Sequence, residues 1–248
     1  MLLDAHTHLD EYINYENGQI LEHQALKDIE ELQIKSLANS MDIPSYEKNL
    51  ELSQRNELII PSFGIHPWRA AYYEDSLDKL EPYIHNSEMI GEIGLDFQWT
   101  EKETFKSQVK VFEFFLDKIQ KGTPKIMNLH TKGAEREIIQ LLKKYRSERA
   151  IIHWYSGPRQ ELRELIDMGC YFTISVEVKY SDFIGNIARE IPLDKLLMET
   201  DNPSGEQWLS KETGMPRHIT GVYKKVAQIR NMDPIELEQK VWQNFMSL

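Results

Sequence analysis

Two histidines close to the first residue have the spacing of a metal site. The chain begins Met1-Leu-Leu-Asp-Ala-His-Thr-His-Leu-Asp10, an apolar run that ends in His6-x-His8. Side chains alternate between the two faces of a β-strand, so residues two apart point the same way. His6 and His8 would then direct two imidazoles to one point, and neutral imidazole binds divalent transition metals well. Alone, the motif is equally compatible with two polar residues at a strand end.

Four further potential ligands occur at the ends of, or within, other apolar runs. They are Glu92 in 89–96, His130 after Asn128-Leu129, His153 after Ile151-Ile152, and Asp201 in Met198-Glu-Thr-Asp201. Each one alone could be a helix cap or a buried, hydrogen-bonded histidine. Together they point to an ion, because burying six polar or charged groups side by side without one is costly.

This set of residues predicts two divalent metal ions that share one carboxylate. Four histidines, one glutamate and one aspartate suffice for two ions if one carboxylate bridges. Glu92 is the best candidate, since a carboxylate has two oxygens and Glu92 lies in the middle of the ligand order. Mixed imidazole and carboxylate ligands suit Zn²⁺ or Mn²⁺, and Mg²⁺ is less natural with histidine. Paired ions activate water and stabilise charge on attacking and leaving oxygens.

Short apolar runs alternate with longer amphipathic segments that would position these residues. The runs are 2–6, 36–40, 58–64, 89–94, 125–130, 150–153, 171–175 and 196–200. Helical spacing of apolar residues is clearest in 103–120, 135–145 and 159–168. The alternation predicts an α/β fold, a (β/α)8 TIM barrel in which residues 1–248 form a single domain. The carboxyl ends of barrel strands share one face, which would bring the ligands together.

The composition is that of an ordinary globular protein, with 41% hydrophobic and 28% charged residues. The single cysteine, Cys170, excludes an intrachain disulfide and fits a small core residue. We see no signal peptide and no membrane-spanning run, so we expect a cytoplasmic protein with no membrane partner. No obligate protein partner is evident, and we expect a monomer or weak oligomer. The net charge of −11 argues against a broadly basic nucleic-acid surface, although a local basic rim is compatible with it.

Taken together, the motifs resemble those of the TatD family of metal-dependent hydrolases, among the amidohydrolase-like TIM barrels. The matching segments occur in the family's order: Asp4-Ala-His-Thr-His-Leu-Asp10, Gly64-Ile-His-Pro67, Glu92-Ile-Gly-Leu-Asp96, Leu129-His130, His153-Trp-Tyr-Ser-Gly157 and Glu199-Thr-Asp-Asn-Pro203. The resemblance implies one metal held by His6, His8, Glu92 and Asp201, and another held by Glu92, His130 and His153. It further implies a deoxyribonuclease that hydrolyses phosphodiester bonds with a water activated by two metals. Asp201 and Glu92 would be catalytic, with Asp201 positioning that water or taking its proton.

The residues that would contact the substrate depart in part from the family's pattern. The family commonly has an arginine two residues after the histidine of the fifth strand, where this chain has Lys132, which lacks the bidentate fork of arginine. We expect His66, Lys132 and Arg159 to bind substrate phosphate, with Arg217 as a further cation beside the metals. His66 could instead donate a proton to the leaving group or only order its loop.

Three loop aromatic residues are candidates for base stacking. They are Trp68, Phe97 and Trp99, each of which could equally be a packing residue.

Two other functions remain open at this point. One is a metal-dependent amidohydrolase or esterase that cleaves a small-molecule substrate. The other is a catalytically idle metal-binding scaffold, against which the presence of all six ligands argues.

Overall fold

Eight parallel strands form the centre of the protein in the computed structural model, which describes residues 1–147 and 149–248. The strands are β1 (Leu2–Thr7), β2 (Ile34–Asn39), β3 (Ile59–Phe63), β4 (Met89–Asp96), β5 (Ile126–Lys132), β6 (Ala150–Ile152), β7 (Tyr171–Ile174) and β8 (Leu196–Met198). Their order in the sheet follows their order in the chain. Two backbone hydrogen bonds, Asp201 N to His6 O (2.9 Å) and His8 N to Asn202 O (2.8 Å), join the segment after β8 to β1. The fold is therefore a (β/α)8 TIM barrel, as predicted.

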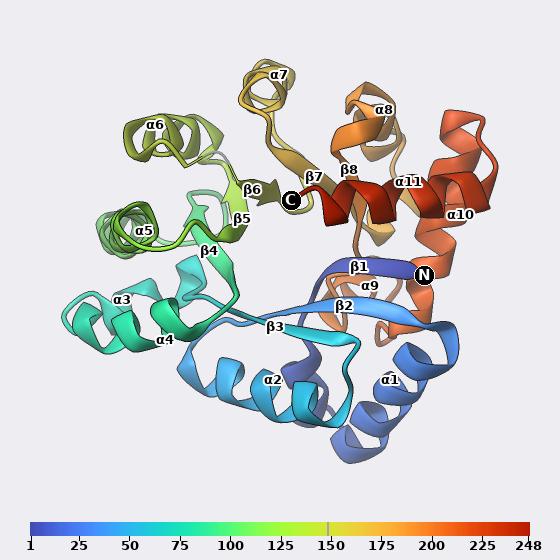
Figure 1. The fold of residues 1–248 in the computed structure, drawn as a ribbon, viewed down its shortest axis with the longest axis horizontal. Helices are drawn as coiled ribbons and strands as arrows, with labels where there is room; N and C mark the ends of the chain where they lie inside the picture. The colour runs from blue at the N-terminus through green and yellow to red at the C-terminus, as the bar shows by residue number, and fades with distance from the viewer. Residues whose placement is uncertain (148) are drawn as a thin grey trace.

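Helices pack around the strands, most of them as an outer layer (Figure 1). They are α1 (Gly18–Leu32), α2 (Ile43–Arg55), α3 (Ala70–Tyr73), α4 (Glu81–Asn86), α5 (Phe105–Lys121), α6 (Glu135–Tyr145), α7 (Arg159–Asp167), α8 (Asp182–Glu190), α9 (Ser204–Ser210), α10 (Ile219–Arg230) and α11 (Pro234–Met246). The three helices predicted most clearly correspond to α5, α6 and α7. In the described part of the chain, no helix has the length and apolar character needed to cross a membrane.

Apolar side chains of both layers form one core. In α5 the buried positions Phe112, Phe115, Leu116 and Ile119 recur at helical spacing and pack toward the barrel. Removing a side chain of this size from water stabilises the fold by about 1.5–3 kcal/mol. Cys170 is fully buried in the same core, as expected of a small core residue.

Strand β4 is shaped around Glu92. A Cβ atom at Gly64 would lie 2.2 Å from the carbonyl oxygen of Glu92, so only glycine allows this approach of β3 to β4. The pairing of β4 with β5 shifts register between Ile90 and Ile93, the interval that contains Glu92. Such irregularities redirect a side chain locally. The carboxylate of Glu92 is thereby directed toward the carboxyl ends of the other strands.

Candidate metal centre and active site

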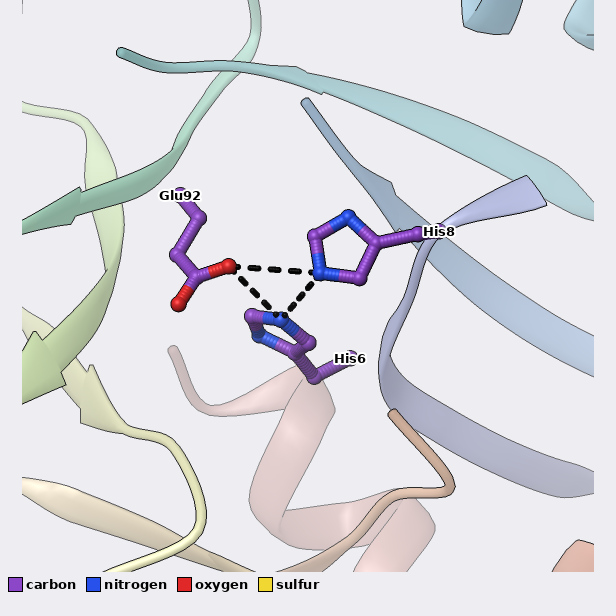
Figure 2. A group of neighbouring side chains, drawn as sticks. All are labelled: His6, His8 and Glu92. Carbon is purple, nitrogen blue, oxygen red and sulfur yellow. Dashed lines mark hydrogen bonds and ion pairs between the residues drawn. The ribbon is translucent and has the colours of Figure 1, made fainter. Parts of the chain in front are cut away.

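The six predicted ligands meet around the carboxylate of Glu92. Its Oε2 lies 3.3 Å from Nε2 of His6 and 3.3 Å from Nε2 of His8. Figure 2 shows both imidazoles pointing toward that oxygen and toward each other. Oδ1 of Asp201 completes this side of the cluster, 3.3 Å from Nε2 of His8 and 3.6 Å from Nε2 of His6.

The other oxygen of Glu92 faces a second pair of imidazoles. Its Oε1 lies 2.7 Å from Nδ1 of His130 and 2.9 Å from Nε2 of His153. These two ring nitrogens are 3.3 Å apart. The two oxygens of this buried carboxylate therefore face separate pairs of histidines, which is the arrangement of a bridging ligand.

Hydrogen bonds on the far side of each ring decide which nitrogen of His6 and His8 carries a proton. Nδ1 of His8 lies 3.1 Å from the carbonyl oxygen of Asn39, which can only accept. Nδ1 of His6 lies 2.9 Å from Oδ1 of Asn128, whose amide nitrogen donates to the carbonyl of Ala5 at 2.7 Å. Both histidines then donate through Nδ1, and the Nε2 atom of each faces Glu92.

Carboxylates lie on the far side of the second pair of rings, with a hydrogen bond at His130 and an ion pair at His153. Nε2 of His130 lies 3.1 Å from Oδ2 of Asp96, and Nδ1 of His153 lies 3.7 Å from Oε2 of Glu199. Burial would raise the pKa of Asp96, but the hydrogen bond from His130 lowers it to about 2, so Asp96 is ionised and accepts. Carboxylate or carbonyl partners of this kind orient metal-ligating histidines in proteins.

The donor set fits divalent cations. Nε2 of His6 and of His8 lie 3.2 Å apart, and although burial would lower the pKa of His8, Asp201 and Glu92 raise it well above its usual range, so this position favours a positive charge such as a metal cation supplies. Burial would raise the pKa of Glu92, but the surrounding histidines hold it well below its usual range, so the carboxylate is anionic. Imidazole nitrogens with carboxylate oxygens are ligands typical of Zn²⁺ and Mn²⁺. The cluster could therefore hold metal.

His66 differs from the other four histidines of the cluster. Its Nε2 lies 3.4 Å from Oε1 of Glu92, close enough for a ligand by distance alone. However, its Nδ1 accepts a hydrogen bond from the backbone nitrogen of Trp68 at 3.1 Å, which places the proton on Nε2. Burial lowers the pKa of His66 to about 4, so the ring is neutral near pH 7. His66 therefore presents an N–H donor to the centre.

Glu199 is a site residue that our sequence analysis did not single out. It is fully buried, and neither of its oxygens has a hydrogen-bond partner among the described residues. Its one ion pair in that set is with His153, whose Nδ1 also lacks a hydrogen bond. A buried carboxylate is costly without a partner, so its position beside this ring indicates a role in orienting His153. The segment Glu199-Thr-Asp201 was a signal, but it identified only Asp201.

We predict that Glu199→Gln weakens metal binding while the barrel still folds. The amide keeps the shape of the side chain but loses the charge that makes His153 a more basic ligand. Partners of ligating histidines contribute about 10–100-fold to metal affinity, and we expect a loss in that range. Competition titration with a chromophoric chelator measures it. Glu190→Gln is the matched control, because Glu190 lies on α8 and pairs with Arg159 at the surface. Equal affinities of the two variants would contradict the role of Glu199.

A cavity of about 280 Å³ opens over this centre. Among the described residues its lining comprises His8, Glu11, Met41, His66, Trp68, Arg69, Glu92, Trp99, His130, Lys132, His153, Trp154, Asp201, Ser204, Gly205 and Trp208. His66 and Lys132, two of the predicted substrate contacts, are in it. Lys132 is nearly fully buried and donates to Ser156 Oγ at 3.0 Å and to the carbonyl of Trp154.

The structure does not bring the two predicted arginines to this cavity. Arg159 begins α7 and pairs with Glu190 at 2.9 Å, and it is absent from the lining just given. Arg217 forms a two-pronged ion pair with the fully buried Asp28 of α1 and is likewise absent from the lining. Each guanidinium group is held by a carboxylate that is distant from it in the sequence. The arginine that does line the cavity is Arg69, which our sequence analysis did not consider.

Comparisons with known proteins show which family the chain resembles. The family model described as TatD related DNase matches residues 3–248. An uncharacterized metal-dependent hydrolase of Buchnera aphidicola is 27% identical over 260 residues, covering 100% of this chain and 95% of the relative. Human deoxyribonuclease TATDN3 is 27% identical over 219 residues, covering 82% of this chain and 79% of that protein.

A solved structure shows the same fold. The TatD homologue YjjV of Escherichia coli superposes with a TM-score of 0.87 at 19% identity, covering 100% of this chain and 97% of the other. Because the family model covers nearly the whole chain, the protein belongs to the TatD family of metal-dependent hydrolases.

Proposed function

We propose that this protein is a deoxyribonuclease that hydrolyses phosphodiester bonds with two divalent metal ions. The observation that carries the proposal is the division of the Glu92 carboxylate between two pairs of imidazole nitrogens. A site for a single ion would not need both oxygens to face separate ligand sets. The name of the human relative, a deoxyribonuclease, supports DNA as the substrate.

One ion would be held by His6, His8, Asp201 and Oε2 of Glu92, and the other by His130, His153 and Oε1 of Glu92. Paired divalent ions lower the pKa of water and neutralise charge on a phosphodiester. The nitrogen-rich ligand set supports Zn²⁺ or Mn²⁺ over Mg²⁺.

Asp201 is suited to take a proton from the attacking water. Its side chain is 18% exposed, whereas the exposed fraction is 2% for Glu92, so Asp201 is the carboxylate of the pair that opens more to the cavity. Burial would raise the pKa of Asp201, but the hydrogen bond from His8 and the neighbouring histidines lower it, so the group is ionised. Its backbone has φ = 52°, in the left-handed region, directly after β8. Such conformations are costly for aspartate and cluster at functional sites.

His66 and Lys132 would contact the substrate phosphate. The Nε2–H of His66 points at the centre of the cluster, where it can donate to a phosphate oxygen or to the leaving oxygen. Lys132 supplies a positive charge in the wall of the cavity, although burial lowers its pKa. Neither residue is needed to bind metal. Their task would be to orient and neutralise the phosphodiester.

A comparison of DNA forms tests the proposal. The cavity is small and the net charge of −11 disfavours a long contact with a polyanion, so an end of a strand should enter more readily than the middle of a duplex. We expect metal-dependent cleavage of end-labelled single strands to be faster than cleavage of closed circular duplex. We also expect a shallow dependence of binding on salt, with about two to four phosphate contacts. Electrophoresis of timed digests and anisotropy titrations at several salt concentrations measure these quantities.

The same screen includes small esters, amides and lactones, assayed with the same metals. Rapid turnover of one of these, with no cleavage of any DNA, would replace the proposal with a small-molecule hydrolase.

A further inference from the structure

Most of the tryptophans of this protein gather at the metal centre. Four of the five, Trp68, Trp99, Trp154 and Trp208, line the cavity above it. The fifth, Trp242, is in α11, whose Asn244 donates to the carbonyl of Leu196 at the start of β8, the opposite end of that strand from Asp201. Aromatic surface is therefore concentrated where the centre opens.

Two of these four indoles are held by carboxylates of the protein. Nε1 of Trp68 donates to Oδ2 of Asp96 at 2.7 Å, and Nε1 of Trp154 donates to Oε2 of Glu177 at 2.6 Å. Asp96 in turn accepts from His130, so Trp68 helps to set the position of a candidate metal ligand. The structure thus explains both residues by contacts within the chain.

In the described chain, no carboxylate holds the indole of Trp99 or of Trp208 in this way. Trp99 follows β4 and is 46% exposed, and Trp208 is in α9 and is 58% exposed. Their rings meet edge to face, with centroids 5.3 Å apart and planes at 63°. Within the described chain neither indole N–H has a hydrogen-bond partner. Two segments remote in sequence thus place two large, exposed aromatic rings together on the rim of the cavity.

The position of this pair favours a ligand with a flat ring attached to a phosphodiester. The ring of Trp99 lies 6.4 Å from that of His130, and Nζ of Lys132 lies 5.8 Å from the centroid of Trp99. A nucleobase is separated from its phosphate only by the sugar. A base would therefore fall at this rim when its phosphate lies between Lys132 and the metal ligands.

The net charge of the protein also favours stacking on a base. With a net charge of −11, few cations are available to hold a polyanion, so binding must draw on another interaction. Stacking of a base on an aromatic side chain supplies binding that does not depend on phosphate charge, and it tolerates any base because every base has a π-face.

We propose that Trp99 and Trp208 form a subsite for one unpaired nucleobase of a single-stranded DNA end. This inference rests on the proposed function, because it takes the phosphate at the metal centre as its reference. A base inside a duplex already has both faces covered by its neighbours, so it reaches the subsite only after it leaves the stack. The subsite thereby selects frayed or single-stranded ends. Phe97 is not part of it, because its ring stacks on Phe105 at 4.1 Å.

The experiment compares two oligonucleotides that differ only in their bases: a labelled hexathymidylate and an abasic strand of the same length. Dissociation constants are measured by fluorescence anisotropy with Mn²⁺ in an Asp201→Asn background, in which cleavage is suppressed. We expect Trp99→Ala and Trp208→Ala to weaken binding of the thymidylate by about 5- to 150-fold, the effect of removing a stacked aromatic side chain. Binding of the abasic strand should change less than twofold, and Trp99→Phe should restore most of the affinity.

Tyr72→Ala is the control, because Tyr72 is a 76% exposed aromatic residue of α3 that does not line the cavity. It should bind both strands as the parent does. Equal losses on thymidylate and abasic strands, or no loss on either, would overturn the subsite.

The outcomes separate this inference from the proposed function. With Asp201 intact, the tryptophan variants should raise KM for the thymidylate and leave kcat within about twofold. If the parent cleaves oligonucleotides and the tryptophan variants match it in KM, the function stands and the subsite fails. If the parent cleaves no DNA but still binds thymidylate through Trp99, the subsite stands and the function fails.

Discussion

Replacing Glu92 with alanine should reduce the metal content of the reconstituted protein from the proposed two ions per chain to one or none, and turnover should disappear with it. The reason is that Oε2 of Glu92 faces His6 and His8 while Oε1 faces His130 and His153, so one substitution removes a ligand from both ions. The loss of affinity should exceed the 10–100-fold that removal of a partner of a ligating histidine costs. Elemental analysis after dialysis and competition titration measure the two quantities.

His66→Ala is the matched control for this experiment. His66 contacts Oε1 of Glu92, the oxygen that His130 and His153 also face. The backbone N–H of Trp68 donates to Nδ1 of His66 and so places the ring proton on Nε2, and His66 should therefore not be a ligand. Its variant should therefore keep both ions and lose catalytic efficiency. A protein that binds one ion at most, with the same affinity in the parent and in Glu92→Ala, would exclude the bridging role. Loss of metal in His66→Ala would show that the tautomer argument is wrong.

Asp201→Asn should lower kcat by about 10²- to 10⁴-fold, the usual contribution of a general base. Asparagine has the shape of aspartate, but it cannot accept a proton from water at neutral pH. The barrel should remain folded, because the hydrogen bond from Asp201 to His6 that closes it is made by the backbone nitrogen. Steady-state kinetics on an oligonucleotide end and thermal unfolding followed by circular dichroism give the two readouts.

Glu11→Gln provides the comparison for Asp201. Glu11 is another carboxylate in the lining of the cavity, but it contacts Ser204 rather than the metal ligands. Its variant should turn over within a few-fold of the parent. Near-normal turnover of Asp201→Asn would remove Asp201 from the catalytic role, whatever its effect on metal affinity.

Local patterns in the sequence were sufficient for the architecture. Each of the eight strands overlaps the apolar run that predicted it, and α6 has the bounds predicted from its spacing. This works because a buried parallel strand and an amphipathic helix each need their apolar residues at a fixed local interval. The convergence of the six ligands followed from the same argument, since parallel strands deliver their ends to one face of a barrel.

The sequence by itself therefore determined the barrel and the convergence of the six candidate ligands, but the role of each group depended on partners remote in the chain. His6 presents Nε2 because Asn128 accepts from its Nδ1, and Glu199 belongs to the site because it faces His153. Arg159 and Arg217 carry the charge expected of phosphate contacts, yet Glu190 and Asp28 hold them elsewhere. Trp208 meets Trp99 although more than 100 residues separate them in the sequence. Residue type and spacing specify what a side chain can do, whereas hydrogen-bond partners, ion pairs and neighbours in space decide what it does, and these are set only when the chain closes into its tertiary structure.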